Sequence, residues 1–356
     1  MSLRLVTIII CILQSSGCST LRYYAQSIDG HLELMAKRQP VEQLLQDQET
    51  PESLRQQLLR VEEIRNFASS QLLLPDNDSY RSFVRIEREA MVWVVVAAAE
   101  FSIQPRSWCY PVIGCAGYRG YFSKQRAEDF GQELRALGLD VAIEPVPAYS
   151  TLGWFDDPVP SSVIHWPETR LAGLIFHELA HQQLYLPGDS AFNEAFATSL
   201  EREGVTRWLQ AESAPAAIKA WRIGQKREQS FVDLLLRTRQ RLEALYALSI
   251  ADQQKRQRKA AEFRRLQAEY QELRKQWDGF DGYDAWFDRD PNNARLASVA
   301  TYEQWVPAFR LLLAQAGGRM DAFYRACERL AQLPPAERHG EMETLRATAL
   351  HSGLED

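Results

Sequence analysis

The chain has 356 residues, of which 46% are hydrophobic and 25% are charged, and its formal net charge is −6 at pH 7. These values are ordinary for a globular protein with room for one large domain or two smaller ones. The negative net charge, and the interleaving of basic residues with Glu and Gln, argue against a nucleic-acid-binding surface.

Residues 1–17 have the order of a secretory signal peptide: a basic start, MSLR, then an apolar run, LVTIIICIL, then small polar residues. The apolar run is about half of the ~20 residues that cross a bilayer, so we expect a cleaved signal rather than a lasting membrane span. Gly17 and Cys18 resemble the end of a bacterial lipoprotein signal, although Ser15 stands where such signals carry Leu. That resemblance implies a lipid anchor on Cys18, and Ser19 favours the outer membrane over the inner one; secretion without lipid is the alternative.

Residues 20–105 are expected to be mostly helical. Residues 40–72 have helical spacing in two pieces, with Thr50 as a cap and Pro51 as the first helical residue of the second piece. Residues 80–103 are predicted to form either a long buried helix or a helix that runs into a strand.

Residues 106–205 are predicted to form an α/β core. Strand-like pieces occur at residues 107–113, 118–123 and 141–150, and a helix is predicted over 124–138. The following turn-rich stretch leads into the segment that carries the chemistry.

Two cysteines of this core, Cys109 and Cys115, are close enough in sequence to close a small loop. In an oxidising periplasm we expect a disulfide between them. Cys327 lies at an apolar helical position and is predicted to be a buried free thiol. The sequence contains no C-x-x-C pair of the redox or zinc-binding kind.

The stretch LAGLIFHELAHQQLY, residues 171–185, places His, Glu and His in an apolar helix, where such residues are rare. His177 and His181 are four residues apart, so both imidazoles lie on one helix face and can hold one zinc ion at ~2.0–2.1 Å each. Glu178 lies beside the metal and suits a general base for a metal-bound water. This H-E-x-x-H pattern on a helix is a zinc metalloprotease signature.

A catalytic zinc site needs a third protein ligand and an open position. Glu194 is the candidate, because it lies 13 residues after His181 on a helix predicted over 190–212, with Asp189 or Ser190 as its cap. A tight turn between the two helices would complete a His, His, Glu set, as in thermolysin-like enzymes.

Two further residues are expected around these ligands. Glu201 follows Glu194 by seven residues on the same helix face and could accept the outer N–H of a ligand histidine. The alternative for Glu201 is an exposed helix charge. Asn193 directly precedes Glu194 and is also expected to lie next to the metal ligands without binding the metal.

Residues 206–356 are predicted to be helical, with a hairpin or extended arm over 215–278. Phe263, Leu266, Tyr270, Leu273 and Trp277 step by three and four, which is the spacing of a coiled-coil seam; simple packing with a solvated outer face is the alternative. We therefore predict an α+β, predominantly helical fold with a small β-sheet and a long helical arm. Residues 18–356 are expected to form a single unit.

Several motifs together resemble a known family. These are HELAHQ, DSAFNEAFA and RWL, with AYSTLGWFDDPV before them and NNARLA after them. They resemble the bacterial family of predicted zinc-dependent aminopeptidases, which are often lipoproteins of the HExxH–Glu (gluzincin) type. The resemblance implies a zincin-like core with one Zn²⁺, the ligands His177, His181 and Glu194, and Glu178 as the catalytic residue.

The remaining parts of a peptidase site have several candidates. Tyr302 or Tyr149 could donate a hydrogen bond to the oxyanion. Asp156, Asp157 or Glu168 could bind a free α-ammonium group. The segment AYSTLGWF could be an edge strand that pairs with an extended peptide, or an ordinary core strand or turn.

We therefore predict a zinc-dependent peptidase of the bacterial envelope, an aminopeptidase that acts on peptides or proteins. It would face the periplasm, be held to the membrane by its lipid, and bind no nucleic acid. An endopeptidase with the same metal centre, a non-catalytic envelope scaffold with structural zinc, and a coincidental motif without metal are the alternatives.

Overall fold

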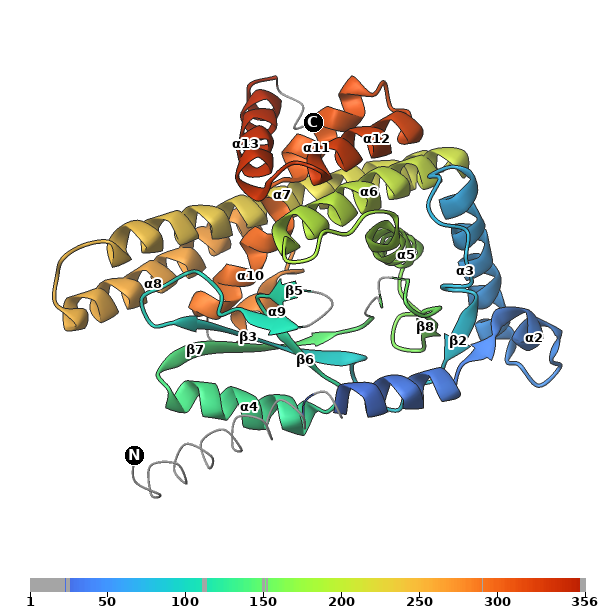
Figure 1. The fold of residues 1–356 in the computed structure, drawn as a ribbon, viewed down its shortest axis with the longest axis horizontal. Coiled ribbons are helices and arrows are strands. Elements are labelled where there is room, and N and C mark those ends of the chain that lie inside the picture. Colours follow the sequence, from blue (N-terminus) through green and yellow to red (C-terminus); the bar gives the residue numbers. More distant parts are fainter. Residues whose placement is uncertain are drawn as a thin grey trace, which may run out of the picture.

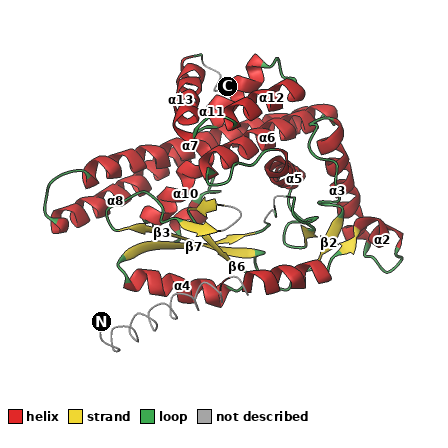
Figure 2. Ribbon diagram, viewed as in Figure 1, coloured by secondary structure: helices red, strands yellow, loops and turns green. Residues whose placement is uncertain are grey.

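The computed structural model describes residues 23, 26–110, 114–148, 151, 153–289 and 291–352, and for residues 299–303 it describes the backbone alone. The predicted signal peptide and Cys18 lie outside the described residues. The described chain is mainly helical, with small β-sheets (Figure 2), which confirms the predicted α+β, predominantly helical class. No helix among the described residues has the length and apolar character needed to cross a bilayer.

The helices of the described chain are α2 (Val41–Gln46), α3 (Glu52–Ser70), α4 (Lys124–Ala136), α5 (Glu168–Gln183), α6 (Ser190–Ala211), α7 (Pro215–Tyr246), α8 (Asp252–Gln276), α9 (Asp284–Phe287), α10 (Asn293–Glu303), α11 (Val306–Gln315), α12 (Met320–Ala331) and α13 (Pro335–His351). The strands are β1 (Gln39–Pro40), β2 (Ser82–Val84), β3 (Val92–Ala99), β4 (Trp108–Tyr110), β5 (Gly114–Ala116), β6 (Arg119–Tyr121), β7 (Leu139–Val146) and β8 (Val159–Pro160). Residues 26–36 are also helical.

The sheet nearest the candidate site is antiparallel, with the strand order β6-β3-β7. β3 pairs with β7 along its whole length, from Val92 opposite Val146 to Ala99 opposite Leu139. The other strands form the separate β1-β2-β8 sheet and the β4-β5 hairpin.

Alternate side chains of β3 pack in opposite directions, as the two-residue period of a strand requires. Val95 packs with Ala127 of α4, whereas Val96 and Ala98 pack with Ala294 of α10. Figure 1 shows α4 along one side of this sheet and α10 on the other. The helix predicted within residues 80–103 is therefore wrong, whereas the strand of the second alternative is confirmed as β3. Its sequence is a continuous apolar run without alternation, because side chains on both of its faces are packed or line an apolar cavity.

The predicted start of α3 needs a small correction. Pro51 is the cap of α3 rather than its first helical residue, and Thr50 makes no capping contact there. The helix predicted over 124–138 is confirmed as α4, and Gly138 follows it with a φ of +77°, a conformation that favours glycine.

The predicted helical arm is confirmed as a hairpin of α7 and α8, which extends from one end of the molecule (Figure 1). Leu266, Tyr270 and Trp277 of the predicted seam are buried against α7, with Phe263 and Leu273 partly buried beside them. The main core lies elsewhere, around α3, α5, α6, α11 and α12, and includes Cys327 as a free, buried thiol.

Candidate metal centre and its cavity

The helices α5 and α6 form an antiparallel pair that brings the predicted ligands together, and both predicted helices are confirmed. Asp189 caps α6 by accepting a hydrogen bond from the backbone N–H of Phe192 at 3.1 Å. The side-chain amide of Asn193 accepts from the N–H of Leu186 and donates to its C=O, both at 2.8 Å. Asn193 therefore ties the turn between the helices and fixes the start of α6, where Glu194 lies.

The three predicted ligand side chains converge on one point. One ligand atom from each of His177, His181 and Glu194 lies within 4.8 Å of the others. Oε2 of Glu194 is 3.3 Å from Nε2 of His177 and 3.6 Å from Nε2 of His181. Ligand atoms at ~2.0–2.1 Å from a tetrahedral zinc ion are about 3.3 Å apart, so this donor set fits zinc in both chemistry and spacing.

Glu201 lies behind the first histidine. Its Oε2 is 3.0 Å from Nδ1 of His177, and an ionised carboxylate can only accept a hydrogen bond. His177 therefore donates from Nδ1 and leaves Nε2 free to bind a metal. Gly173 makes room for this contact, since a Cβ there would lie 3.1 Å from Oε1 of Glu201. Nδ1 of His181 has no such partner among the described residues.

The charges of these groups depend strongly on one another. Burial alone would lower the pKa of His177, but its hydrogen bonds to Glu194 and Glu201 raise that pKa well above the ordinary value. Burial opposes ionisation of Glu194, yet His181 and His177 lower its pKa to about 2. The site therefore has a strong affinity for positive charge, which protons supply when no metal is bound.

The ligands line a cavity of about 740 Å³ between α5, α6 and the face of the β6-β3-β7 sheet. Val92, Val94 and Val96 of β3, with Ala142 and Val146 of β7, form its apolar wall. Glu178 also lines this cavity, and burial raises the pKa of its carboxyl group. A carboxylate with a raised pKa next to the ligand set is suited to proton transfer near neutral pH.

Several predicted neighbours of the site lie elsewhere. None of Asp156, Asp157 and Glu168 is among the described residues that line the cavity. Asp157 accepts a hydrogen bond from the N–H of Thr151 at 2.9 Å, and Glu168 accepts from the indole of Trp208 at 2.6 Å. These carboxylates serve the fold, and an α-ammonium group in the cavity would not meet them.

The predicted edge strand AYSTLGWF is also wrong for its described residues, which form turns and irregular backbone. The sheet presents its face to the cavity instead. Tyr149 lies outside the described residues. Tyr302 belongs to α10, but its side chain is outside those that the structure describes.

Four tyrosines that were not identified from the sequence line the cavity, and two of them, Tyr118 and Tyr185, are affected by the charge of Glu194. Desolvation and the charge of Glu194 raise the pKa of both phenols, and the charge of Glu178 contributes for Tyr118 alone. Tyr118 itself is 39% exposed, and the charges of the third ligand and of the candidate base both act on its phenol. Tyr185 follows the H-E-x-x-H motif by only four residues, whereas no local spacing links Tyr118 to it.

Tyr118 follows a disulfide-closed hairpin that contacts the α5–α6 turn. The structure joins Cys109 to Cys115 across β4 and β5. Gly114 in this hairpin has a φ of +78°, and a Cβ there would lie 2.7 Å from the backbone N of Gly188. The disulfide hairpin thus packs directly against the turn between the ligand-bearing helices.

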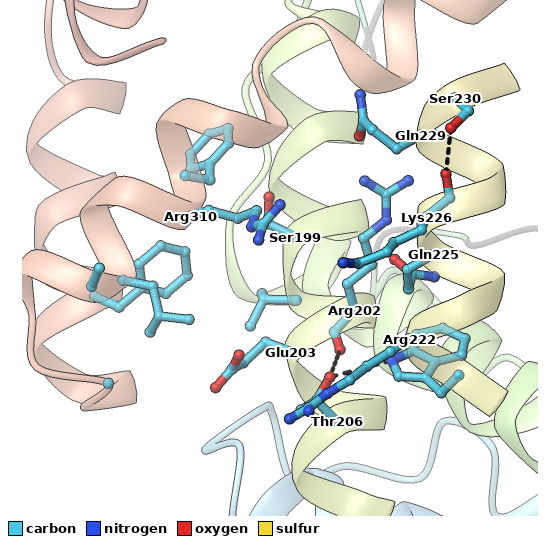
Figure 3. Close-up of a pocket in the computed structure, with 17 residues that line it drawn as sticks. Ser199, Arg202, Glu203, Thr206, Arg222, Gln225, Lys226, Gln229, Ser230 and Arg310 are labelled. Atoms are coloured by element: carbon cyan, nitrogen blue, oxygen red, sulfur yellow. Dashed lines mark hydrogen bonds between the residues drawn. The ribbon is translucent and has the colours of Figure 1, made fainter. Parts of the chain in front are cut away.

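A second cavity, of about 940 Å³, lies between α6, α7 and α11 (Figure 3). Four basic side chains line it, namely Arg202, Arg222, Lys226 and Arg310. Its described lining residues include one carboxylate, Glu203, which pairs with Arg207 at 2.6 Å, and no histidine or cysteine. A metal ligand set is therefore confined to the first of these two cavities.

The chain belongs to the family described as "Putative aminopeptidase", which matches residues 22–342. The predicted membership of an aminopeptidase family is thereby confirmed, and it supports a peptidase function. No curated protein and no solved structure matches the chain.

Proposed function

We propose that this protein is a zinc-dependent aminopeptidase of the HExxH–Glu (gluzincin) type with a zincin-like core. The main support is the convergence of three ligand atoms from His177, His181 and Glu194 within 4.8 Å at the wall of a cavity. Two histidines and one carboxylate are the ligand set of thermolysin-like catalytic zinc sites. The family supports the peptidase class and the preference for amino-terminal residues.

The residues around the ligands have distinct roles in this proposal. Zinc held there would lower the pKa of a water molecule to about 7 and polarise the scissile carbonyl group. Glu178 accepts the proton of the attacking water and returns it to the leaving amine. Tyr118 donates a hydrogen bond to the developing oxyanion, since it lines the cavity and the charges of Glu194 and Glu178 both act on its phenol. Glu201 keeps the His177 ring oriented and its Nδ1 protonated.

We further propose that the protein acts in the bacterial envelope. The segment order of residues 1–17 supports export, and Cys18 supplies a site for lipid. The mature chain would then face the periplasm from the outer membrane. Radiolabelled palmitate tests this proposal, because Cys18→Ser should lose the label and release the protein from the membrane fraction.

A peptide-library digest with zinc-loaded protein tests the catalytic proposal. We expect products shortened one residue at a time from the amino terminus, and we expect Glu178→Gln to abolish them with its zinc content unchanged. Glu203→Gln is the matched control, because it makes the same chemical change on α6 outside the ligand set. Zinc analysis of His177→Ala should show loss of the metal.

Other outcomes of this digest would favour the alternatives. Cleavage of internal bonds, including those of amino-acetylated peptides, would indicate an endopeptidase with the same centre. Bound zinc with no hydrolysis by the wild type would indicate a structural site in a scaffold protein.

A further inference from the structure

The cavity that holds the ligand set also contains one cationic side chain, Arg170, at the start of α5. Arg170 precedes His177 by seven residues, which is two helical turns, so both lie on the same face of α5. Seven residues of helix span about 10.5 Å, and an extended peptide advances about 3.3 Å per residue. The backbone of Arg170 therefore lies about three extended peptide residues from that of His177 along α5.

Arg170 is the only lysine or arginine among the described residues that line this cavity. Four carboxylates line it: Glu178 and Glu194 lie at the ligand set, and the other two pair with residues other than Arg170. Glu144 pairs with Arg289 at 2.6 Å and with Arg295 at 3.0 Å, and Glu201 pairs with His177. The cavity is thus acidic at the ligand set and positive at Arg170.

The guanidinium group of Arg170 makes no hydrogen bond and no ion pair with any residue that the structure describes. Its contact is with Trp166, over whose ring it stacks at 3.5 Å from the centroid. Arg170 is exposed to solvent, and only partial desolvation of its guanidinium group lowers its pKa. In contrast, the buried Arg338 pairs with Asp189 at 2.9 Å.

Stacking on an indole leaves the edge of a guanidinium group available. That edge carries paired N–H donors that match the two oxygens of a carboxylate. The carboxylate of a bound peptide would also supply the negatively charged partner that Arg170 does not have among the described residues. The structure therefore has a solvent-exposed cation at the lining of the cavity, oriented by the indole of Trp166 and with its donors unused.

We propose that Arg170 binds the C-terminal carboxylate of a short peptide, so that the substrates are peptides of about three or four residues with a free C-terminus. This inference rests on the proposed peptidase function and adds the substrate class to it. The chain of such a peptide runs from the ligand set along α5 to Arg170. Arg170 is a specificity residue here, and the chemical step belongs to the ligand set and Glu178.

Three tripeptides of matched size test the proposal: trialanine, trialanine amide, and an Ala-Ala-Asp amide that carries a carboxylate only on its side chain. For the full-length, zinc-loaded wild type we expect kcat/KM for trialanine to exceed that for its amide about tenfold to hundredfold. In Arg170→Gln this preference should disappear, with hydrolysis of the amide unchanged. Arg170→Lys should keep part of the preference, because it retains the charge but loses the paired donors.

Arg222→Gln is the matched control, since it removes the same charge from the second cavity and should leave the preference intact. Equal hydrolysis of trialanine and its amide by the wild type would overturn the inference while leaving the peptidase function intact. If the wild type hydrolysed the Ala-Ala-Asp amide with the same kcat/KM as trialanine, the assignment of Arg170 to the C-terminal carboxylate would be overturned.

Binding provides a readout that does not need turnover. Calorimetry with zinc-loaded Glu178→Gln should show tighter binding of trialanine than of its amide, and the added Arg170→Gln change should remove the difference. Equal binding of the two peptides would overturn the inference even if no hydrolysis is observed. Absence of hydrolysis by the wild type with the binding difference present would instead count against the proposed function alone.

Discussion

Oε2 of Glu201 lies 3.0 Å from Nδ1 of His177, and this contact determines which nitrogen of the ring faces the ligand set. The carboxylate accepts the Nδ1 proton, so Nε2 is directed toward Oε2 of Glu194, 3.3 Å away. A carboxylate behind a ligand histidine also increases the basicity of the ring and restricts its rotation. Glu201 thus belongs to the metal centre, although it is not one of the three converging ligands.

Replacing Glu201 should weaken zinc binding. We expect Glu201→Ala to reduce zinc affinity about tenfold to hundredfold, because the ring of His177 loses its orienting partner. Glu201→Gln should cause a smaller loss, since the amide oxygen still accepts the hydrogen bond. Competition with a chromogenic chelator measures both values, and Glu203→Gln is the control. An unchanged affinity in Glu201→Ala would mean that this contact is incidental.

Zinc affinity should increase with pH. The raised pKa of His177 means that its ring is protonated near neutral pH in the metal-free protein, and zinc must displace that proton. For one proton released, the affinity should strengthen about tenfold per pH unit over the interval below the raised pKa of this ring. Calorimetric titrations in two buffers of different ionisation enthalpy measure the proton release directly. Constant affinity over this interval would contradict the raised pKa.

The ligand-bearing helices could be predicted because their signals are local. Pro167 precedes the first turn of α5, and Asp189 caps α6. The four-residue spacing of His177 and His181 fixes their common face without any knowledge of the fold. The turn between the helices is short, so Glu194 could be expected opposite them.

The rest of the site depends on contacts between distant segments, which a single sequence does not reveal. The run from Val92 to Ala99 is apolar throughout because α4 covers one face, and α10 and the apolar wall of the cavity share the other, so it lacks the alternation that identifies a strand. Tyr118 lines the cavity from a segment next to the disulfide hairpin, which packs on the α5–α6 turn. Arg170 has no ion pair among the described residues, and this becomes evident only in the folded chain, where Glu144 of the same cavity pairs with other arginines.

Tyr118 should contribute to turnover rather than to metal binding. Removing one donor from an oxyanion site lowers kcat about a hundredfold to a thousandfold. We expect a loss of this size in Tyr118→Phe, with zinc content and KM almost unchanged. Tyr185→Phe is the matched comparison and should lose less than about tenfold, because only the charge of Glu194 affects its phenol. A larger loss in Tyr185→Phe would reassign the oxyanion donor to that residue.

Close packing between α5 and α6 should make Gly204 sensitive to substitution. A Cβ at Gly204 would lie 2.6 Å from Cδ2 of Phe176 and 2.8 Å from Cδ1 of Leu72. We expect Gly204→Ala to lower the free energy of unfolding by about 1–3 kcal/mol through overpacking, as measured by urea denaturation. Gly340→Ala is the control, since Gly340 lies within α13 with open space around it and alanine favours the helix. Equal stability of the two variants would show that α6 can shift without cost.

Asn193 should couple the stability of the α5–α6 turn to zinc binding. Its buried amide makes both a donor and an acceptor contact with the backbone of Leu186, each at 2.8 Å. Asn193→Asp keeps the acceptor but places a carboxylate against the carbonyl oxygen of Leu186. We expect a loss of about 1–3 kcal/mol in the free energy of unfolding, as for an unsatisfied buried polar group. Because Glu194 is the next residue, zinc affinity should fall as well.

Asn66→Asp makes the same chemical change on an exposed part of α3 and should affect neither quantity. If Asn193→Asp lost stability but kept full zinc affinity, the position of Glu194 would be set by α6 packing alone and not by this turn.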